Sequence, residues 1–494
     1  MSTTPADGRI LAANIRGPVT FSEGEDGQLT PRRGGGGVVS ALSSAFGTGD
    51  TLWICAAQGD PDRVMAGRAP GGRLGLDGSP GGAGVRMLDI PPDTFRRAHS
   101  GVANGALWFV HHMLYDTPTV PQFGLAFEPD WAAYRAYNRA VAEALAAEAG
   151  PPADGGGGRG AIRAIVQDYH LSLVPRMLAD LRPDIRIAHF THTPWAPPDY
   201  FRLLPRPVAR QTLEGVLGAD HAGFHCRRWA DAFMDCCEVL LGADVDRARR
   251  RVGYRGHVTG VGVHPLGVDA AELRRRGAEP DVQARMATLA AAAGARKLIV
   301  RIDRTELSKN IIRGLAAYRE LLVRHPEWRG QVTHLLFAYP SRQDLPAYRE
   351  YMAAVTRSVR DICDEFGTGD WEPVTLQVDD DYPRSLAAYR LADVLLVNPL
   401  RDGMNLVAKE GVILSDDGCA LVLSTEAGAA AQLGDDALLV NPYDVTETGQ
   451  ALHQALAMDH KERRRRTDRL AHAAVTLPPA RWFADQVEAL EPPG

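Results

Sequence analysis

The sequence predicts an α/β protein made of two doubly wound, Rossmann-like domains. The chain has 494 residues, which is more than one hydrophobic core usually holds. Short runs rich in Val, Ile and Leu alternate with longer helical patterns, as they do in α/β folds. Several of these runs are continuously apolar, which is typical of parallel strands buried on both faces.

The elements follow in chain order. Strands are predicted at residues 51–57, 161–168, 185–192, 257–263, 296–303, 333–340, 393–399 and 420–424. Long helical patterns cover residues 131–149 and 344–366. Two stretches rich in Gly and Pro, 66–84 and 150–160, are expected to be mobile surface loops without a function of their own.

The domain boundary is placed in the segment 264–297, which reads as a crossover between two α/β units. We expect an N-terminal domain over 1–264 and a C-terminal domain over 265–470. A final helix, within about 471–494, is expected to pack back on the first domain. Ligands of doubly wound sheets bind at the carboxyl ends of the strands, so a cleft between the two domains is the expected site.

Composition excludes several classes of protein. Apolar residues make up 45% and charged residues 23% of the chain, as in soluble globular proteins. The net charge of −6 gives no electrostatic reason to expect nucleic acid or a membrane surface as a partner. No signal peptide or membrane-spanning run is evident, and none of the six cysteines forms a CxxC pair. These features predict a cytoplasmic protein, and they leave a homo-oligomer open.

Polar side chains cluster at the ends of several predicted strands, which indicates a binding or catalytic site. A glycine run at 32–46 opens a helix, where free N–H groups favour an anion such as phosphate. Asp168 and His192 end two neighbouring strands, and could serve sugar hydroxyls or phosphate. Each of them alone is more simply explained as a turn cap or a core histidine, but as two members of one strand-end set they favour a functional role.

Cations follow two strands of the second domain. Arg304 and Lys309 share one post-strand loop and suit a diphosphate, and Arg342 follows the next strand. The alternative is a solvated basic loop. The acidic run 379–381 could bind Mg²⁺, but a helical pattern follows it, which favours acids at a helix N-terminus.

The stretch "NPLRDGMNLVAKEG" (398–411) carries the most polar chemistry. Gly403 permits a tight turn next to Asp402. Glu410 lies seven residues further, which in a helix is close to two turns and roughly 10 Å. Together with the cations, this stretch predicts transfer of a sugar from a nucleotide-sugar without a metal, because Arg and Lys can neutralise the leaving diphosphate.

Several strings together resemble the trehalose-6-phosphate synthase family, glycosyltransferase family 20. They are "GGGGVVSAL", "VQDYHL", "FTHTPWAPPDYFRLLP", "DRTELSKN", "SRQDLPAY", "NPLRDGMNLVAKE" and "LSTEAGAAAQLGDDALLVNPYD", within about residues 10–470. The resemblance implies a GT-B fold and an enzyme that joins glucose from a nucleotide-glucose to glucose 6-phosphate. It also implies retention of the α configuration, no metal and no cofactor.

The resemblance implies a role for individual residues. Its catalytic set is Arg304, Lys309, Asp168, His192 and Asp402. The donor side adds Gly37 at the glycine loop, Gly403, Met404, Asn405, Leu406 and Val407 around the donor phosphate and sugar, and Glu410 at the ribose. His192 would approach the 6-hydroxyl of the donor sugar. On the acceptor side, Asp168 would contact glucose hydroxyls, and Arg16, Trp108 and Arg342 would surround the 6-phosphate.

Two departures from the family pattern bear on the substrates. His99 stands where the family has an acceptor-phosphate tyrosine. The base-contact segment corresponds to about Val378–Asp380 and carries carboxylates. A carboxylate such as Asp380 can accept from both N1–H and N2–H of guanine, whereas uracil offers one N–H. We therefore expect GDP-glucose to be preferred to UDP-glucose.

Other functions remain open on the same scaffold. His99 leaves room for a pseudoglycosyltransferase that couples a nucleotide-activated cyclitol to an amino-cyclitol phosphate, although the intact "RDGMNLVAKE" speaks against it. A catalytically silent regulatory homologue is disfavoured because Arg304, Lys309, Asp402 and Glu410 are all present. A dinucleotide-dependent oxidoreductase is weaker, since no GxGxxG follows a predicted strand with an acid downstream.

Overall fold

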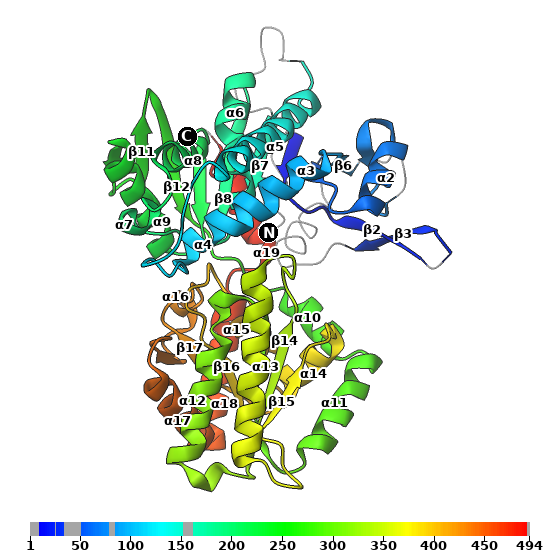
Figure 1. Cartoon of the computed structure of the whole chain (residues 1–494), viewed down its shortest axis with the longest axis vertical. Coiled ribbons are helices and arrows are strands. Elements are labelled where there is room, and N and C mark those ends of the chain that lie inside the picture. The colour runs from blue at the N-terminus through cyan, green and yellow to red at the C-terminus, as the bar shows by residue number, and fades with distance from the viewer. Residues whose placement is uncertain (1–8, 25, 34–50, 79–83, 152–161, 492–494) are drawn as a thin grey trace. The chain divides into compact units, whose positions relative to one another are not determined.

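The chain forms two compact α/β units. The computed structural model describes residues 9–24, 26–33, 51–78, 84–151 and 162–491. The first unit comprises residues up to Pro265 together with the segment from Pro479, and the second comprises Leu266–Pro478 (Figure 1). The second unit ends later than the expected 470 because its last helix, α18 (His460–Val475), continues past that point.

The first unit is built on a ten-stranded sheet of order β10-β11-β12-β9-β8-β7-β1-β4-β6-β5. Its middle strands, from β12 to β6, are parallel, and β10, β11 and β5 are antiparallel additions. The bounds are β1 Arg9–Ala13, β4 Thr51–Ala56, β5 Arg73–Leu74, β6 Val85–Leu88, β7 Ile162–Gln167, β8 Arg186–Thr191, β9 His221–Phe224, β10 Asp244–Asp246, β11 Arg251–Tyr254 and β12 His257–Val263. A separate hairpin pairs β2 (Val19–Glu23) with β3 (Leu29–Arg33).

The strand order reverses between β1 and β7. From β1 the chain moves outward to β4 and β6, then returns to β7 on the other side of β1 and continues through β8 and β9. Ligands of doubly wound sheets bind at such a reversal, beyond the carboxyl ends of the strands. Arg16, Asp168 and His192 follow β1, β7 and β8, so this edge is where they are placed.

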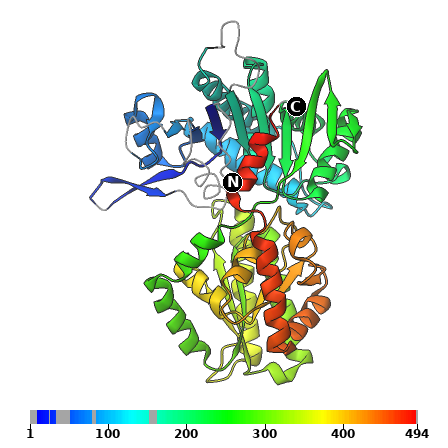
Figure 2. The same cartoon turned by 180° about the vertical axis from the view of Figure 1, so that it is seen from behind.

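Helices cover the first sheet. Their bounds are α2 Asp60–Arg68, α3 Pro92–Arg96, α4 Trp108–His112, α5 Phe127–Glu148, α6 Val174–Leu181, α7 Pro198–Phe201, α8 Arg206–Val216, α9 Arg227–Cys236 and α19 Pro479–Glu488, with a π-helical stretch at Arg97–Leu107. The final helix α19 lies against this sheet, near β7 (Figure 2, red). It buries Trp482 and Gln486 almost completely.

The second unit holds a fully parallel six-stranded sheet of order β15-β14-β13-β16-β17-β18. The bounds are β13 Lys297–Arg304, β14 Val332–Tyr339, β15 Val374–Gln377, β16 Val394–Val397, β17 Ala420–Ser424 and β18 Leu438–Val440. This order is that of a dinucleotide-binding sheet, with its reversal between β13 and β16. The loops after these two strands carry Lys309 and Asp402.

Two apolar cores sandwich the second sheet. Neighbouring residues of β13 alternate between them, with Val300 in one and Ile299 in the other, as the period of a strand requires. One core is covered by α12 (Ile311–Arg324), α13 (Pro346–Phe366) and α17 (Val445–Ala457). The other is covered by α10 (Ala270–Gly277), α11 (Pro280–Ala293), α14 (Tyr382–Leu391), α15 (Val407–Leu414), α16 (Ala430–Leu433) and α18.

Predicted and observed elements agree for the long apolar runs, since every strand predicted from the sequence is present. The segment 66–84 was expected to be a loop, and this is wrong in part: α2 runs to Arg68 and β5 follows at Arg73–Leu74, where it pairs with β6. Residues 79–83 of this segment and residues 152–160 of the second Gly-rich stretch lie outside the described residues. None of the described helices is long and apolar enough to cross a membrane.

Candidate functional site

An ion pair occupies the reversal point of the second sheet. Lys309, in a 3₁₀ turn after β13, places its Nζ 2.7 Å from Oδ2 of Asp402, in the loop after β16. Oδ1 of Asp303 lies 3.9 Å from the same nitrogen. Burial lowers the pKa of Lys309, but Asp402, Asp303 and Glu306 outweigh it and hold the pKa above its ordinary value. A positive charge is therefore fixed where two loops meet.

A fully buried arginine holds these loops together. Arg301, inside β13, pairs with Oδ2 of Asp303 at 3.0 Å and donates to Oδ1 of Asn398 at 2.5 Å. It also donates to the backbone carbonyl of Lys309. Arg301 was not among the predicted site residues. The signal for it was a charged residue directly after the apolar run Leu298–Val300 of a predicted strand.

Arg304 points away from this buried cluster. Its side chain is 59% exposed, and its Nη1 lies 3.3 Å from Oε1 of Glu306, which is buried. A guanidinium that is tethered at the end of a strand yet open to solvent is available to a bound anion. Arg304 and Lys309 thus supply one accessible and one fixed cation in the same loop.

The turn after β16 has its unusual backbone at Asn405. Gly403 was predicted to permit a tight turn, and it is Asn405, two residues further on, that adopts a positive φ of 81°. Asn405 tolerates this conformation because its amide donates to Oδ2 of Asp402 at 3.1 Å and accepts from the N–H of Ala408 at 3.1 Å. The carbonyl of Gly403 instead packs against Gly428. A Cβ added to Gly428 would lie 2.0 Å from the carbonyl oxygen of Gly403.

Glu410 lies in the first turn of α15, close to a tyrosine. The hydroxyl of Tyr389 donates to Oε2 of Glu410 at 3.3 Å. Burial raises the pKa of Glu410, and the tyrosine bond only partly opposes this. The helix begins at Val407, directly after Leu406, so the span of two helical turns expected from Gly403 to Glu410 is wrong.

Lys409, next to Glu410, is fully buried. Its Nζ donates to the carbonyl of Leu266 at 2.7 Å and to Oε1 of Gln432 at 2.6 Å, and neither acceptor is charged. Burial lowers the pKa of Lys409 to about 7. Met404, also predicted for the donor side, is buried, and its carbonyl accepts from the N–H of Ala429 at 2.7 Å.

The acidic run after β15 divides into two parts. Asp381 caps α14 by accepting from the N–H of Arg384 at 3.0 Å, and it pairs with Arg285 at 2.8 Å. This confirms the prediction of an acid at a helix N-terminus. Asp379 and Asp380 are exposed, so their carboxylates are accessible to solvent.

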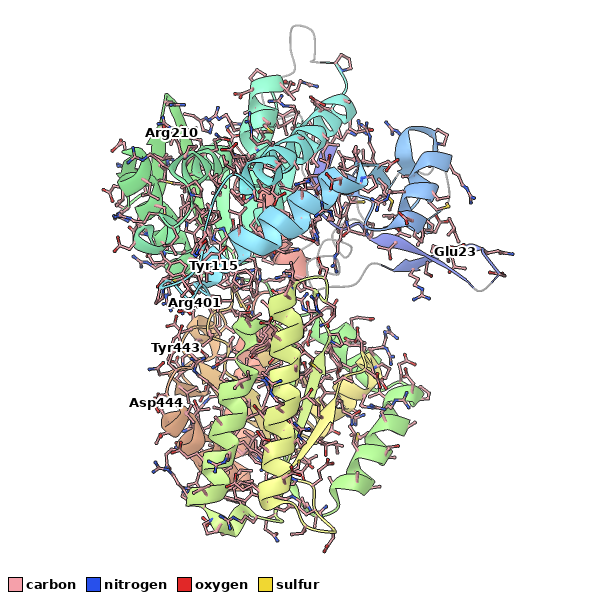
Figure 3. The ribbon with its side chains drawn as sticks, in the orientation of Figure 1. Glu23, Tyr115, Arg210, Arg401, Tyr443 and Asp444 are labelled. Carbon is pink, nitrogen blue, oxygen red and sulfur yellow. The ribbon has the colours of Figure 1, made fainter. Side chains whose placement is uncertain are left out.

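Arg401 and Arg342 also lie in loops after strands of the second sheet. Arg401 donates to the hydroxyl of Tyr443 at 2.9 Å, and both residues are labelled in Figure 3. Arg401 also lies 3.4 Å from Oε2 of Glu426. Arg342 follows β14 with a φ of 47° and donates to the hydroxyl of Tyr348 at 2.6 Å.

Asp168 occupies the reversal point of the first sheet in a strained conformation. Its φ is 72°, and its N–H donates to the carbonyl of Phe190 at 2.6 Å. One carboxylate oxygen accepts from the N–H of His192 at 3.2 Å, and the other lies 3.7 Å from Nδ1 of His170. Burial raises the pKa of Asp168, but its interactions with His170 and His192 outweigh it and lower the pKa well below its usual range.

The imidazole of His192 is engaged on both sides. Its Nε2 lies 2.8 Å from Oε1 of Gln167, and its Nδ1 lies 3.2 Å from Nε2 of His225. Burial lowers the pKa of His192 to about 4, so the ring is neutral at neutral pH. A sugar hydroxyl would reach a ring nitrogen only by displacing one of these partners.

The remaining predicted residues are spread over the first unit. His99 stacks on Phe95 at 5.3 Å and on His170 at 5.7 Å, and its Nε2 lies 2.9 Å from Nδ2 of Asn104. His99 is therefore linked to Asp168 through His170. Trp108 is buried at the start of α4. Arg16 has an exposed side chain after β1, and Gly37 lies outside the described residues.

Comparison with known proteins identifies relatives of this chain. A bifunctional trehalose-6-phosphate synthase/phosphatase of Thermoproteus tenax is 34% identical over 83% of this chain, which spans only 54% of that relative. An alpha,alpha-trehalose-phosphate synthase [UDP-forming] of Schizosaccharomyces pombe is 31% identical over 94% of this chain and 86% of the relative.

Solved structures agree in fold. One from E. coli, described as trehalose-6-phosphate bound with UDP-2-fluoro glucose, is 26% identical, covers 98% of this chain and 99% of its own, and superposes with a TM-score of 0.83. The model of glycosyltransferase family 20 matches residues 18–492. The chain is thus a glycosyltransferase of the GT-B type and belongs to glycosyltransferase family 20.

Proposed function

We propose that the protein transfers glucose from a nucleotide-glucose to glucose 6-phosphate and forms α,α-trehalose 6-phosphate with retention of configuration. The observation that carries this is the partly buried Lys309–Asp402 pair at the reversal point of the second sheet, with Arg304 open to solvent beside it. The second unit is assigned to the donor and the first to the acceptor.

Three features of the second unit support its assignment to the nucleotide-sugar donor. Arg304 and Lys309 receive the diphosphate, since one is accessible and the other is a fixed ammonium. Asp402 and the turn Gly403–Val407 face the sugar and the phosphates. The carboxylate of Glu410 accepts from the ribose hydroxyls, as a carboxylate at the start of a helix can.

The strained Asp168 supports the assignment of the first unit to the acceptor, glucose 6-phosphate. Its carboxylate stays ionised at neutral pH and can accept from glucose hydroxyls. The exposed Arg16 and the ring of His99 supply donors for the 6-phosphate, with Trp108 of the same unit also assigned to it. His99 in place of a tyrosine leaves a donor at that position.

The reaction balances without a covalent enzyme intermediate. The anomeric hydroxyl oxygen of the acceptor bonds to C1 of the donor glucose while the bond from C1 to the phosphate oxygen breaks. The departing diphosphate takes the hydroxyl proton on the same face. Arg304 and Lys309 stabilise the negative charge that grows on the diphosphate. A trapped glycosyl-enzyme adduct would contradict this account.

The nucleotide is proposed to be GDP, and the relatives supply the competing candidate. The exposed carboxylates of Asp379 and Asp380 suit the two N–H donors of guanine. The S. pombe relative is named UDP-forming and the E. coli structure holds a UDP sugar, which support UDP-glucose instead.

A donor panel tests both levels of the proposal. Purified protein is incubated with glucose 6-phosphate and UDP-, GDP- or ADP-glucose, and the product is identified with its anomeric configuration. α,α-Trehalose 6-phosphate, formed fastest from GDP-glucose, is expected. Equal rates with both donors, or faster transfer from UDP-glucose, would reject the guanine preference. No product with any donor would favour a cyclitol-coupling or silent homologue.

A further inference from the structure

A row of hydrogen bonds runs from the C-terminal helix to His192 within the first unit. We propose that Gln486 and Gln167 are positioning residues, which fix the tautomer of His192 and thereby hold Asp168 in place. The consequence for substrate rests on the proposed function, in which Asp168 binds the acceptor sugar.

The row begins at the backbone of α19. The amide of Gln486 donates to the carbonyl of Trp482 at 3.2 Å. This contact turns the oxygen of Gln486 toward Gln167, whose Nε2 donates to it at 3.1 Å. Both glutamines are almost completely buried, so water does not compete for these bonds.

The orientation of Gln167 then decides the protonation of His192. Since the amide nitrogen of Gln167 faces Gln486, its oxygen faces Nε2 of His192 at 2.8 Å. An oxygen only accepts, so Nε2 of His192 carries the proton and Nδ1 has the lone pair. Nδ1 in turn accepts from Nε2–H of His225 at 3.2 Å.

The fixed ring holds its own backbone. The N–H of His192 donates to Oδ1 of Asp168 at 3.2 Å. Trp482 of α19 also packs on the ring of His192, with 5.4 Å between ring centroids. Loss of the anchor at Gln486 therefore loosens both the ring and the donor that steadies the strained Asp168.

The test reads the tautomer directly. ¹⁵N-histidine NMR of the full chain, with the signal assigned by its loss in His192→Asn, should show neutral Nε2–H imidazole from about pH 5.5 to 8. In Gln486→Met the Gln167 amide is free to turn over, so both tautomers should appear. The KM for glucose 6-phosphate should rise about three- to tenfold, the equivalent of one hydrogen bond, with a smaller change in kcat.

A matched control separates this effect from general damage. Gln211 of α8 belongs to the same unit, and its Oε1 accepts from Nε1–H of Trp131 at 3.2 Å. This bond lies outside the row that links Gln486, Gln167 and His192. Gln211→Met should leave both the His192 signal and the KM unchanged. Gln486→Glu keeps an acceptor for Gln167 and should retain the Nε2–H tautomer, which serves if the Met variant does not fold.

Two results would overturn the proposal. One is an Nδ1–H tautomer in the unsubstituted protein, and the other is a Gln486→Met protein with unchanged tautomer and KM. If the unsubstituted protein forms no disaccharide phosphate, the NMR result still decides whether the glutamines fix His192. Failure of the proposed function is thereby distinguished from failure of this inference.

Discussion

At the scale of single residues, Lys409 is the most unusual side chain of the second unit. It is fully buried, and its Nζ donates to two neutral groups, the carbonyl of Leu266 and Oε1 of Gln432. An ammonium without a carboxylate partner is costly in such surroundings, which is why its pKa falls to about 7 from an ordinary value of 10.5. Its neighbours Ala408 and Glu410 belong to the proposed donor helix, so its charge state bears on the stability of that helix.

The depressed pKa of Lys409 predicts a stability that depends on pH. Between about pH 7 and 10.5 the unfolded chain keeps this proton and the folded chain releases it, so unfolding takes up a proton and stability rises with pH. The free energy of unfolding should gain at most about 1.4 kcal/mol per pH unit from this group within that window. Lys409→Met should remove the gain.

Thermal unfolding of both proteins at several pH values measures this effect. The melting temperature of the unsubstituted protein should rise relative to that of Lys409→Met as pH increases from 7. The exposed Lys461, which belongs to α18, supplies the control: Lys461→Met should parallel the unsubstituted protein. Parallel curves for Lys409→Met would show that the buried amine stays protonated throughout.

At the scale of elements, the proposed donor turn depends on a second turn packed against it. The N–H of Gly428 donates to the carbonyl of Asp402 at 3.1 Å, and the N–H of Ala429 donates to that of Met404 at 2.7 Å. A side chain on Gly428 would collide with the carbonyl of Gly403, since its Cβ would lie 2.0 Å away. The glycine therefore sets how closely the two turns approach.

Gly428→Ala should consequently weaken donor use. Overpacking typically costs about 1–3 kcal/mol, and displacement of the turn Asp402–Asn405 should raise the donor KM about tenfold. The KM for glucose 6-phosphate should change little. Gly369→Ala is the matched control, because nothing lies within 4 Å of a Cβ there. An unchanged donor KM in Gly428→Ala would show that the turn does not contact the donor.

Elements with a strong local signal were predicted from the sequence, and others were not. Continuous apolar runs such as β16 and β17 are recognisable in the sequence, because buried parallel strands need no polar face. Short strands such as β9, with the sequence "HAGF", carry no periodic signal and were missed. The turn at Gly403 was predicted on residue type, whereas the positive φ at Asn405, which a side-chain bond to Asp402 supports, was not predicted.

The site was predictable where charged residues follow strands. Lys309 and Asp402 are nearly a hundred residues apart, but the strand order brings their loops together, as the alternation of strands and helices indicates. The partners of His192 were not predictable in this way. Gln486 reaches Gln167 from the far end of the chain, and no local pattern records such a contact.

At the scale of the whole molecule, the proposal divides the work between two units that each have a complete sheet and core. The donor residues belong to Leu266–Pro478, whereas Asp168 belongs to the first unit. If the division is right, binding of the nucleotide and transfer of the sugar can be lost separately. Asp168→Asn removes a charge from the acceptor side, whereas Lys309→Met removes one from the donor side.

Asp168→Asn should therefore bind a nucleoside diphosphate as the unsubstituted protein does, yet transfer glucose at least about a hundredfold more slowly. Lys309→Met should lose both properties, because its ammonium is the fixed cation beside Asp402. Calorimetry with GDP and UDP measures the binding, and product formation measures the transfer. Lys461→Met serves as the control for the loss of a lysine charge. Weakened nucleotide binding in a folded Asp168→Asn protein would contradict the division, since the carboxylate of the first unit would then belong to the donor site.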